Sequence, residues 1–322
     1  VKYSIDSINL IIPKFRIIVK KIMKKKLLLF VFSFLIFLTA NSCKRTAFEK
    51  ETNKEVILAS FTVLADIIEN VAKDEFVVKS IIKPGVEVHG YQPTPSDLIK
   101  ASKAFVFIDN GFGFELWAEK FVSNLQINRV TISNRLEPIF ISEDFYKGKP
   151  NPHAWISPKR GMIYVDVIVD YLSELKPSEA ESFKNNGQIY KNKIAKIDED
   201  FSLFINNLEK NNRYLVTCEG AFSYLTNDYG LKEAYLWPVN AESQITPKRM
   251  ARTISLVKNK NIPSVFCEST VSNESQMVVA RATGAKFGGD LFVDSISQDN
   301  KSANTYLKML QHNLTLIKKG LN

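Results

Sequence analysis

Hydrophobic positions after residue 55 follow two alternating periods. Short apolar runs predict buried strands at 56–61, 76–82, 104–108, 130–132, 214–217, 234–237, 264–267 and 291–293. Between these runs, apolar residues recur every three or four positions and predict helices at 63–73, 95–103, 113–125, 220–229, 247–260, 273–284 and 303–318. Strands that alternate with helices indicate parallel sheets covered on both faces, and the two blocks predict two α/β lobes.

The segment between the two blocks has a different pattern. Its apolar residues keep the helical period from Pro177 to residue 211, without another proline, at Phe183, Tyr190, Ile194, Ile197, Phe201, Phe204 and Leu208. A helix of this length is about 50 Å long, more than one small lobe needs. We interpret it as one rigid helix that links the lobes. Gly187 costs roughly 1 kcal/mol against alanine and leaves two shorter helices as the alternative.

These patterns predict an α/β fold with two lobes, each with a parallel sheet flanked by helices, joined by one long rigid linking helix. The expected parts are a signal region at 1–42, a first lobe at 43–176, the linking helix at 177–211 and a second lobe at 212–322.

The net charge of +9 over 322 residues would suit a protein that binds nucleic acid or an acidic membrane. The charge is concentrated at one end, however. Residues 1–42 contain eight basic residues and one acid, so the other 280 residues have a net charge of only +2. Because the body of the chain has no basic stripe, we expect no nucleic-acid partner.

The first 43 residues contain a pattern typical of a secretory signal. Three lysines at 24–26 precede an apolar run at 27–40, and small residues lead to Cys43. The run is shorter than the roughly 20 residues that span a bilayer. The ending resembles a bacterial lipoprotein signal, in which Cys43 would be acylated and become the first residue, although Ala40 stands at a usually aliphatic position. An uncleaved N-terminal anchor is the alternative.

Met23 offers a better start than the residues before it. We interpret 1–22 as a misplaced gene start, or else as a long basic region, with the lipoprotein signal at 23–42.

The chain has only three histidines, and two of them lie in proline-rich loops. His89 and His153 occur within 84–95 and 149–155, whereas His312 falls in a helical run and is expected on a polar helix face. Prolines and aromatic residues would hold the two loop imidazoles in place. Each of these two histidines, taken alone, also fits a locally hydrogen-bonded loop residue.

Cys218 and Cys267 are a single pair and make no disulfide framework. Cys267 lies in an apolar run, which favours a buried small side chain. Export would permit a disulfide, but the spacing does not require one.

Six segments together resemble one family, the solute-binding lipoproteins of metal ABC transporters of the manganese, zinc and iron class. They occur in family order at 89–97, 110–117, 151–155, 217–225, 265–269 and 291–295. The resemblance covers about 270 residues and implies two α/β lobes joined by one long helix. It also implies four metal ligands, listed in chain order as His89, His153, Glu219 and Asp294.

The implied ligand set favours a hard cation. Zinc-importing relatives usually have histidine where this chain has Glu219, and often a histidine-rich loop that is absent here. Oxygen ligands suit Mn²⁺ and Fe²⁺ better than an added imidazole would. We expect Mn²⁺ as the transported ion, with Fe²⁺ and Zn²⁺ as alternatives. The family's usual Asp-Pro before the first histidine is replaced by Glu87 and Val88.

The resemblance implies an exported monomer, lipid-anchored to a bacterial membrane facing the periplasm or the cell exterior, that delivers a divalent metal to an ABC permease. A surface adhesin is an alternative with the same fold and anchor. A metal-dependent hydrolase is a remote one, because a catalytic site needs an open coordination position and a base. Gly111 and Gly113 begin no dinucleotide fingerprint, since Leu116 replaces the third glycine. We therefore expect no enzyme.

Overall fold

The computed structural model describes residues 54–322, except 124, 126, 144–145, 240–244 and 300. The predicted signal region at 1–42 and Cys43 lie outside the described residues. Within the described part of the chain, no helix has the length and apolar character required to cross a membrane.

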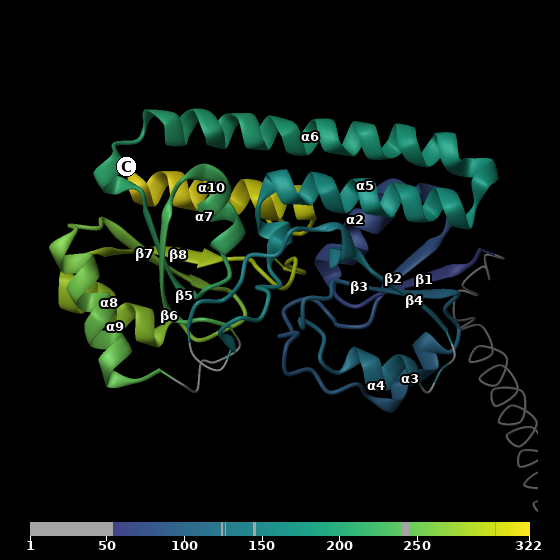
Figure 1. Ribbon diagram of the computed structural model, residues 1–322, viewed down its shortest axis with the longest axis horizontal. Helices are drawn as coiled ribbons and strands as arrows, with labels where there is room; N and C mark the ends of the chain where they lie inside the picture. Colours follow the sequence, from purple (N-terminus) through teal and green to yellow (C-terminus); the bar gives the residue numbers. More distant parts are fainter. Residues whose placement is uncertain (1–53, 124, 126, 144–145, 240–244, 300) are drawn as a thin grey trace, which may run out of the picture. The chain divides into compact units, whose positions relative to one another are not determined.

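The first lobe contains a four-stranded, all-parallel sheet in the order β2-β1-β3-β4 (Figure 1). Its strands are β1 Val56–Ala59, β2 Val77–Ser80, β3 Val106–Asp109 and β4 Asn128–Thr131. Its helices are α2 Thr62–Ala72, α3 Pro95–Ala101, α4 Ala118–Ser123 and α5 Pro158–Leu175, with α2 and α5 on one face and α3 and α4 on the other. From β1 the chain passes to β2 on one side and then to β3 on the other side. In open parallel sheets, ligands bind beside the carboxyl ends of the strands where the strand order reverses in this way.

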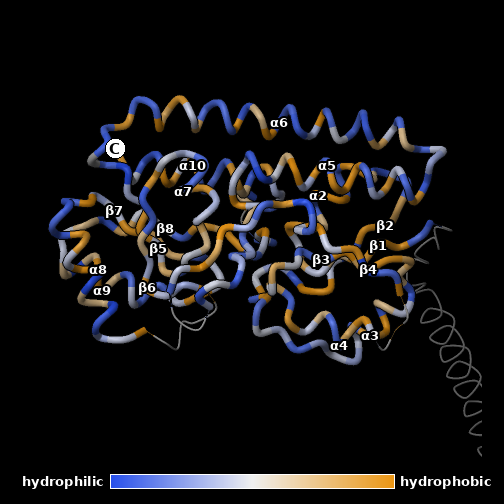
Figure 2. The backbone as a smooth tube through the Cα atoms, in the orientation of Figure 1, coloured by the Kyte–Doolittle hydropathy of each residue, from blue (hydrophilic) through white to orange (hydrophobic). Residues whose placement is uncertain are grey.

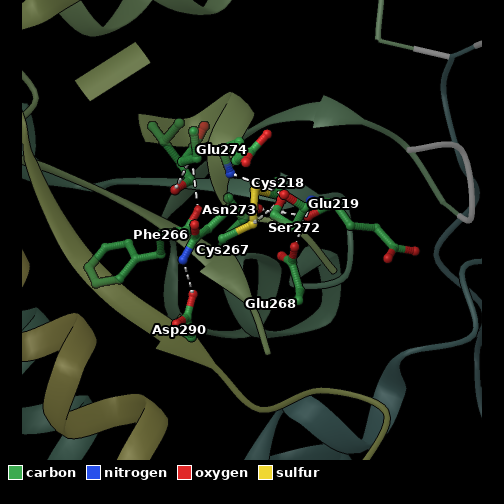
Figure 3. The surroundings of a disulfide bond; sticks show 12 residues. Cys218, Glu219, Phe266, Cys267, Glu268, Ser272, Asn273, Glu274 and Asp290 are labelled. Carbon is green, nitrogen blue, oxygen red and sulfur yellow. Dashed lines mark hydrogen bonds between the residues drawn. A yellow bond between two sulfur atoms is a disulfide. The ribbon is translucent and has the colours of Figure 1, made fainter. Parts of the chain in front are cut away.

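The second lobe has two pairs of parallel strands. They are β5 Tyr214–Glu219 with β6 Lys232–Trp237, and β7 Ser264–Glu268 with β8 Lys286–Leu291. Its helices are α7 Ser223–Tyr229, α8 Pro247–Asn259, α9 Glu274–Thr283 and α10 Tyr306–Leu321. A disulfide between Cys218 of β5 and Cys267 of β7 joins the pairs, with the two Cα atoms 4.8 Å apart (Figure 3). Both cysteines are buried, as expected for Cys267, and they form the disulfide that the spacing had left open.

The long helix α6, Ala180–Asn207, is continuous and follows a 3₁₀ turn at Pro177–Glu179. Its apolar residues recur among polar ones along its whole length, as Figure 2 shows. They pack on α5 and α2 in the first lobe and on α10 in the second. Gly187 does not break the helix. A Cβ atom there would lie 2.3 Å from Cγ2 of Val169, so the glycine lets α5 and α6 approach closely.

Two elements differ from the predicted ones. Helix α5 was not predicted, because residues 163–169 contain valines and isoleucines interrupted only by Tyr164 and Asp166, a pattern typical of a strand. The strand predicted at 291–293 is wrong: β8 ends at Leu291, and its glycines 288 and 289 conceal it in the sequence. The residues after Leu291 are therefore free to form the loop that holds Asp294.

Candidate metal site

His89 lies in the loop that follows β2, and Glu87 holds this loop in place. The Glu87 carboxylate accepts hydrogen bonds from the backbone amides of His89 (2.5 Å) and Gly90 (2.8 Å). The indole of Trp117 donates to the carbonyl of Val88 (3.2 Å). The side chain of Glu87 thus replaces the rigidity that a proline before the histidine would give.

His153 lies between the antiparallel bridge of Phe140 with Pro150 and the start of α5. Its backbone amide donates to Oδ1 of Asn151 (3.1 Å), which also lies 2.9 Å from Nδ1 of the His153 ring. The Phe114 ring packs edge-on against both histidines, with centroid distances of 4.8 Å to His89 and 5.8 Å to His153. Aromatic side chains therefore shield both imidazoles on the first-lobe side.

The two carboxylates come from the carboxyl ends of strands in the second lobe. Glu219 is the last residue of β5, and its backbone amide donates to Oε2 of Glu268, which ends β7 (3.1 Å, Figure 3). Asp294 follows β8 in a loop held by Asn313, whose amide group exchanges two hydrogen bonds with the backbone of Phe292. The fold thus brings the two predicted carboxylate ligands to the end of β5 and to the loop after β8.

The four predicted ligands converge on one point. Nε2 of His89 lies 3.2 Å from Nε2 of His153, 3.7 Å from Oε1 of Glu219 and 4.0 Å from Oδ2 of Asp294. Nε2 of His153 lies 3.8 Å from Oε1 of Glu219 and 3.6 Å from Oδ1 of Asp294. Four donors bound tetrahedrally at about 2.1 Å from one ion would be about 3.4 Å apart. The arrangement therefore fits one metal ion, and each ligand residue is at most 7% exposed.

Burial sets the protonation states in a way that suits a cation. It lowers the pKa of His89 to about 3 and that of His153 well below its usual value, the latter with a smaller contribution from His89. Both rings are therefore neutral near pH 7, as metal ligation requires. Burial, and then the charge of Glu219, raises the pKa of Asp294. Oδ1 of Asp294 accepts no hydrogen bond from any described residue, and a bound cation would satisfy it.

Three buried polar residues support the site in ways that the sequence analysis missed: Asn151, Glu268 and Glu115. The carboxylate of Glu115 accepts hydrogen bonds from Ser60 Oγ (2.6 Å) and from the amides of Asn110 (3.0 Å) and Gly111 (3.1 Å). All three lie in segments that carried the family resemblance. One sequence feature could have identified them: each is a polar residue in or beside an apolar run and close in sequence to a predicted ligand or an aromatic residue.

His312 is not part of the cluster. It lies on α10, with its ring against Phe292 and its Nδ1 atom 3.3 Å from Ser302 Oγ.

Comparisons with known proteins agree with this geometry. Iron-binding protein YfeA of Yersinia pestis is 41% identical over 265 residues, which cover 82% of this chain and 85% of that protein. Manganese ABC transporter substrate-binding lipoprotein PsaA of Streptococcus mitis is 31% identical over 309 residues, covering 93% and 99%. The solved structure of an Mn-bound periplasmic metal binding protein from Candidatus Liberibacter asiaticus matches with a TM-score of 0.78 and 36% identity, covering 84% of this chain and 100% of that one.

The family model described as zinc-uptake complex component A, periplasmic, matches residues 57–320, almost the whole described part of the chain. The resemblance inferred from the six segments is confirmed, and so is the fold of two lobes with one long helix. The chain therefore belongs to the family of zinc-uptake complex component A.

Proposed function

We propose that this protein is the extracytoplasmic solute-binding component of a metal ABC importer. It binds one divalent metal ion between its lobes, through His89 and His153 on one side and Glu219 and Asp294 on the other, and delivers the ion to a permease. One observation carries this proposal. The Nε2 atoms of the two buried histidines lie 3.2 Å apart, and carboxylate oxygens of both Glu219 and Asp294 lie within 4.0 Å of each of them.

Charge provides the switch between binding and release. Without metal, Glu219 and Asp294 are neighbouring acidic groups in a site that excludes water, which makes their joint ionisation costly. A divalent cation compensates both carboxylates and links the two lobes. A permease that favours a state in which the second-lobe carboxylates move away would release the ion. Since α6 packs on both lobes, small tilts fit this fold better than a wide hinge opening.

Mn²⁺ is the proposed cargo, with Fe²⁺ and Zn²⁺ as alternatives. Two carboxylates and two imidazoles form a hard, mixed oxygen and nitrogen ligand set, which suits Mn²⁺ and Fe²⁺. The relatives are named for manganese, iron and zinc, so the ligand chemistry supports the choice more than the names do. Zn²⁺ generally binds such sites more tightly than Mn²⁺, so tight zinc binding alone would not make zinc the cargo.

We further propose that Cys43 carries the lipid anchor and that the mature protein acts as a monomer. The lipoprotein names of several relatives support the anchor. Mass spectrometry of the mature N-terminus tests it, and an unmodified peptide that continues through Cys43 would refute it. A catalytic role is not proposed, because the names of the relatives describe binding and transport, and four protein ligands would fill a tetrahedral site.

Elemental analysis of protein from its native envelope, with competitive Mn²⁺ and Zn²⁺ titration, tests the function. Manganese should accompany the wild type, and Glu219→Ala should weaken binding strongly because it removes one of four ligands and half of the compensating charge. Glu181→Ala removes an exposed carboxylate of α6 and is the matched control. Unchanged metal affinity in Glu219→Ala would remove that residue from the site, and a wild type that binds no divalent metal would overturn the function.

A further inference from the structure

The side chain of Asn151 is buried between the two lobes with all its hydrogen-bonding positions occupied. It is 2% exposed. On the first-lobe side, its Oδ1 atom accepts from the backbone amide of His153 and lies 2.9 Å from Nδ1 of that ring. On the second-lobe side, its Nδ2 atom donates to the carbonyl of Gly220 (2.6 Å) and to Oγ of Ser223 (3.2 Å). One amide group therefore contacts both halves of the metal site.

These partners fix the orientation of the amide and the tautomer of His153. The backbone amide of His153 can only donate, so the Asn151 atom that faces it must be oxygen. The carbonyl of Gly220 can only accept, so the atom that faces it must be the NH₂ nitrogen. Because Nδ1 of His153 faces the oxygen, Nδ1 carries the ring proton. Nε2 then keeps its lone pair on the side where Glu219 and Asp294 lie.

The second-lobe partner of Asn151 is directly connected to a ligand. Gly220 follows Glu219, and its own amide donates to the carbonyls of Trp237 (2.9 Å) and Pro238 (3.0 Å). A Cβ atom at Gly220 would lie 2.6 Å from the Pro238 oxygen, so only glycine fits against this neighbouring backbone. The hydrogen bond from Asn151 to the Gly220 carbonyl therefore couples the position of the backbone beside Glu219 to the first lobe.

The second lobe also holds the backbone of Asn151. The hydroxyl of Tyr224, on α7, donates to the Asn151 carbonyl (2.8 Å) and accepts from the amide of Ile139 (3.1 Å). The loop that carries His153 is thus docked on the second lobe beside the carboxylate ligand.

We propose that Asn151 is the positioning residue that couples the two lobes at the metal site. Its oxygen holds His153 in the Nδ1-protonated tautomer, and its NH₂ group latches the His153 loop to the backbone beside Glu219. A movement that takes Glu219 and the backbone beside it away from the first lobe breaks this latch, so Asn151 slows metal release as well as strengthening binding. The metal-binding part of this inference rests on the proposed function, whereas the tautomer part does not.

Two variants separate the two roles. Asn151→Asp keeps an oxygen acceptor for His153, with an added negative charge beside the ring, but places an oxygen instead of a donor against the Gly220 carbonyl, so it keeps the tautomer and loses the latch. Asn151→Ala loses both roles. Ser223→Ala is the matched control, because it removes one partner of the amide and leaves the bond to Gly220 in place.

The tautomer is measured by ¹⁵N NMR of the imidazoles in the metal-free protein. The wild type, Asn151→Asp and Ser223→Ala should show a protonated Nδ1 at His153, whereas Asn151→Ala should show a mixture or a protonated Nε2. Mn²⁺ release is measured by mixing the loaded protein with excess chelator. Both Asn151 variants should release Mn²⁺ faster. Asn151→Ala should also bind it about 10- to 100-fold more weakly, the usual effect of losing the residue that orients a ligating histidine. Ser223→Ala should remain close to the wild type.

Wild-type tautomer and wild-type release in Asn151→Ala would overturn the proposal. Wild-type release in Asn151→Asp would overturn the latch alone. Thermal unfolding of each variant identifies a folding defect, and Asn151→Asp, which matches asparagine in size, remains informative if the alanine variant does not fold. If the wild type binds no divalent metal, the proposed function fails, while the NMR measurement still decides the role of Asn151 at His153.

Discussion

The indole N–H of Trp155, in the first lobe, donates a hydrogen bond to the carbonyl oxygen of Val293, in the second lobe, over 2.9 Å. Both residues are buried. Val293 directly precedes Asp294, so a first-lobe side chain holds the second-lobe loop that presents this proposed ligand. Trp155 also packs beside His153, with ring centroids 5.3 Å apart. Trp155 therefore contacts the ring of His153 in the first lobe and the residue before Asp294 in the second lobe.

Trp155→Phe should weaken metal binding and stability together. It leaves the buried Val293 carbonyl without its donor, which costs about 1–3 kcal/mol, and frees the loop of Asp294. Thermal unfolding and Mn²⁺ titration measure the two effects. Tyr190→Phe is the control, since it removes a buried hydrogen bond to Asp66 (3.0 Å) that does not involve the metal ligands. If both variants lose stability but keep wild-type Mn²⁺ affinity, Trp155 does not position Asp294.

Glu219→His should shift the metal preference toward zinc. The substitution exchanges a hard oxygen ligand for an imidazole and removes one negative charge, which disfavours Mn²⁺ more than Zn²⁺. We expect Mn²⁺ affinity to fall at least about tenfold, a change of ~1.4 kcal/mol, while Zn²⁺ affinity changes less. Competitive titration gives the ratio directly, with Glu219→Gln as the control for loss of charge alone. A ratio equal to that of the wild type would contradict the assigned role of Glu219 in metal choice.

The buried histidines should make the metal-free protein less stable in acid. The folded-state pKa of His89 is about 3, below the unfolded value near 6.5, so between these limits only the unfolded chain binds the proton. Unfolding therefore becomes easier as pH falls from about 6.5 toward about 3. His89→Gln should flatten this loss in thermal unfolding with chelator present. Equal pH slopes for the variant and the wild type would contradict the buried, neutral imidazole.

Asp294 should have the opposite effect on stability. Its pKa is raised by burial, so the folded state retains a proton that the unfolded chain releases. Its favourable contribution is present at low pH and is lost as pH rises through the folded pKa. Asp294→Asn should therefore gain stability relative to the metal-free wild type as pH rises above the usual aspartate value of about 4. The same thermal scans test this, and a relative loss above that pH would refute it.

Helices that bury only one face could be predicted from the sequence, because their apolar residues recur at helical steps. The long helix was predicted because Tyr190, Ile194 and Ile197 face one packed surface at helical steps. Helix α5 was not, since its buried positions and its crossing with α6 make it apolar on several sides. The proposed ligands His89, His153, Glu219 and Asp294 were predicted through the family resemblance, and their convergence in the fold supports that set.

The supporting contacts could not be predicted because they join residues far apart in the chain. Trp155 and Val293 are 138 positions apart, and Asn151 and Gly220 are 69 apart. The period of hydrophobic residues along the chain does not indicate contacts between residues this far apart. The disulfide was left open for the same reason, since adjacency of β5 and β7 exists only in the folded second lobe.

Removal of the disulfide should destabilise the second lobe. Cys218 and Cys267 close a loop of 49 positions, and loss of a native disulfide typically costs 2–5 kcal/mol, so about that range is expected here. The double variant Cys218→Ala with Cys267→Ala should unfold at lower temperature. Its Mn²⁺ affinity should fall modestly, because Cys218 and Cys267 precede Glu219 and its amide partner Glu268 (Figure 3). Reduction of the wild type should reproduce the shift, and unchanged unfolding in both would contradict a structural role for the disulfide.

The contact between α5 and α6 should tolerate no side chain at Gly187. Although alanine favours helices over glycine by about 1 kcal/mol, a Cβ atom at this position would lie 2.3 Å from Cγ2 of Val169. Overpacking of this kind costs about 1–3 kcal/mol, so Gly187→Ala should lower stability despite its better helix propensity. The double variant Gly187→Ala with Val169→Ala removes the clashing methyl and should recover part of the loss.

Metal binding separates this prediction from a general loss of structure. Gly187 lies in the long helix, and a Cβ atom there would meet Val169 and Val165 of α5, none of which is a proposed metal ligand. Thermal unfolding should therefore report the change, while Mn²⁺ affinity of the folded protein should remain within a few-fold of the wild type, a difference below ~1.4 kcal/mol. A Gly187→Ala variant more stable than the wild type would show that α5 and α6 can separate at this crossing, and a large loss of affinity would show that their spacing sets the distance between the ligands of the two lobes.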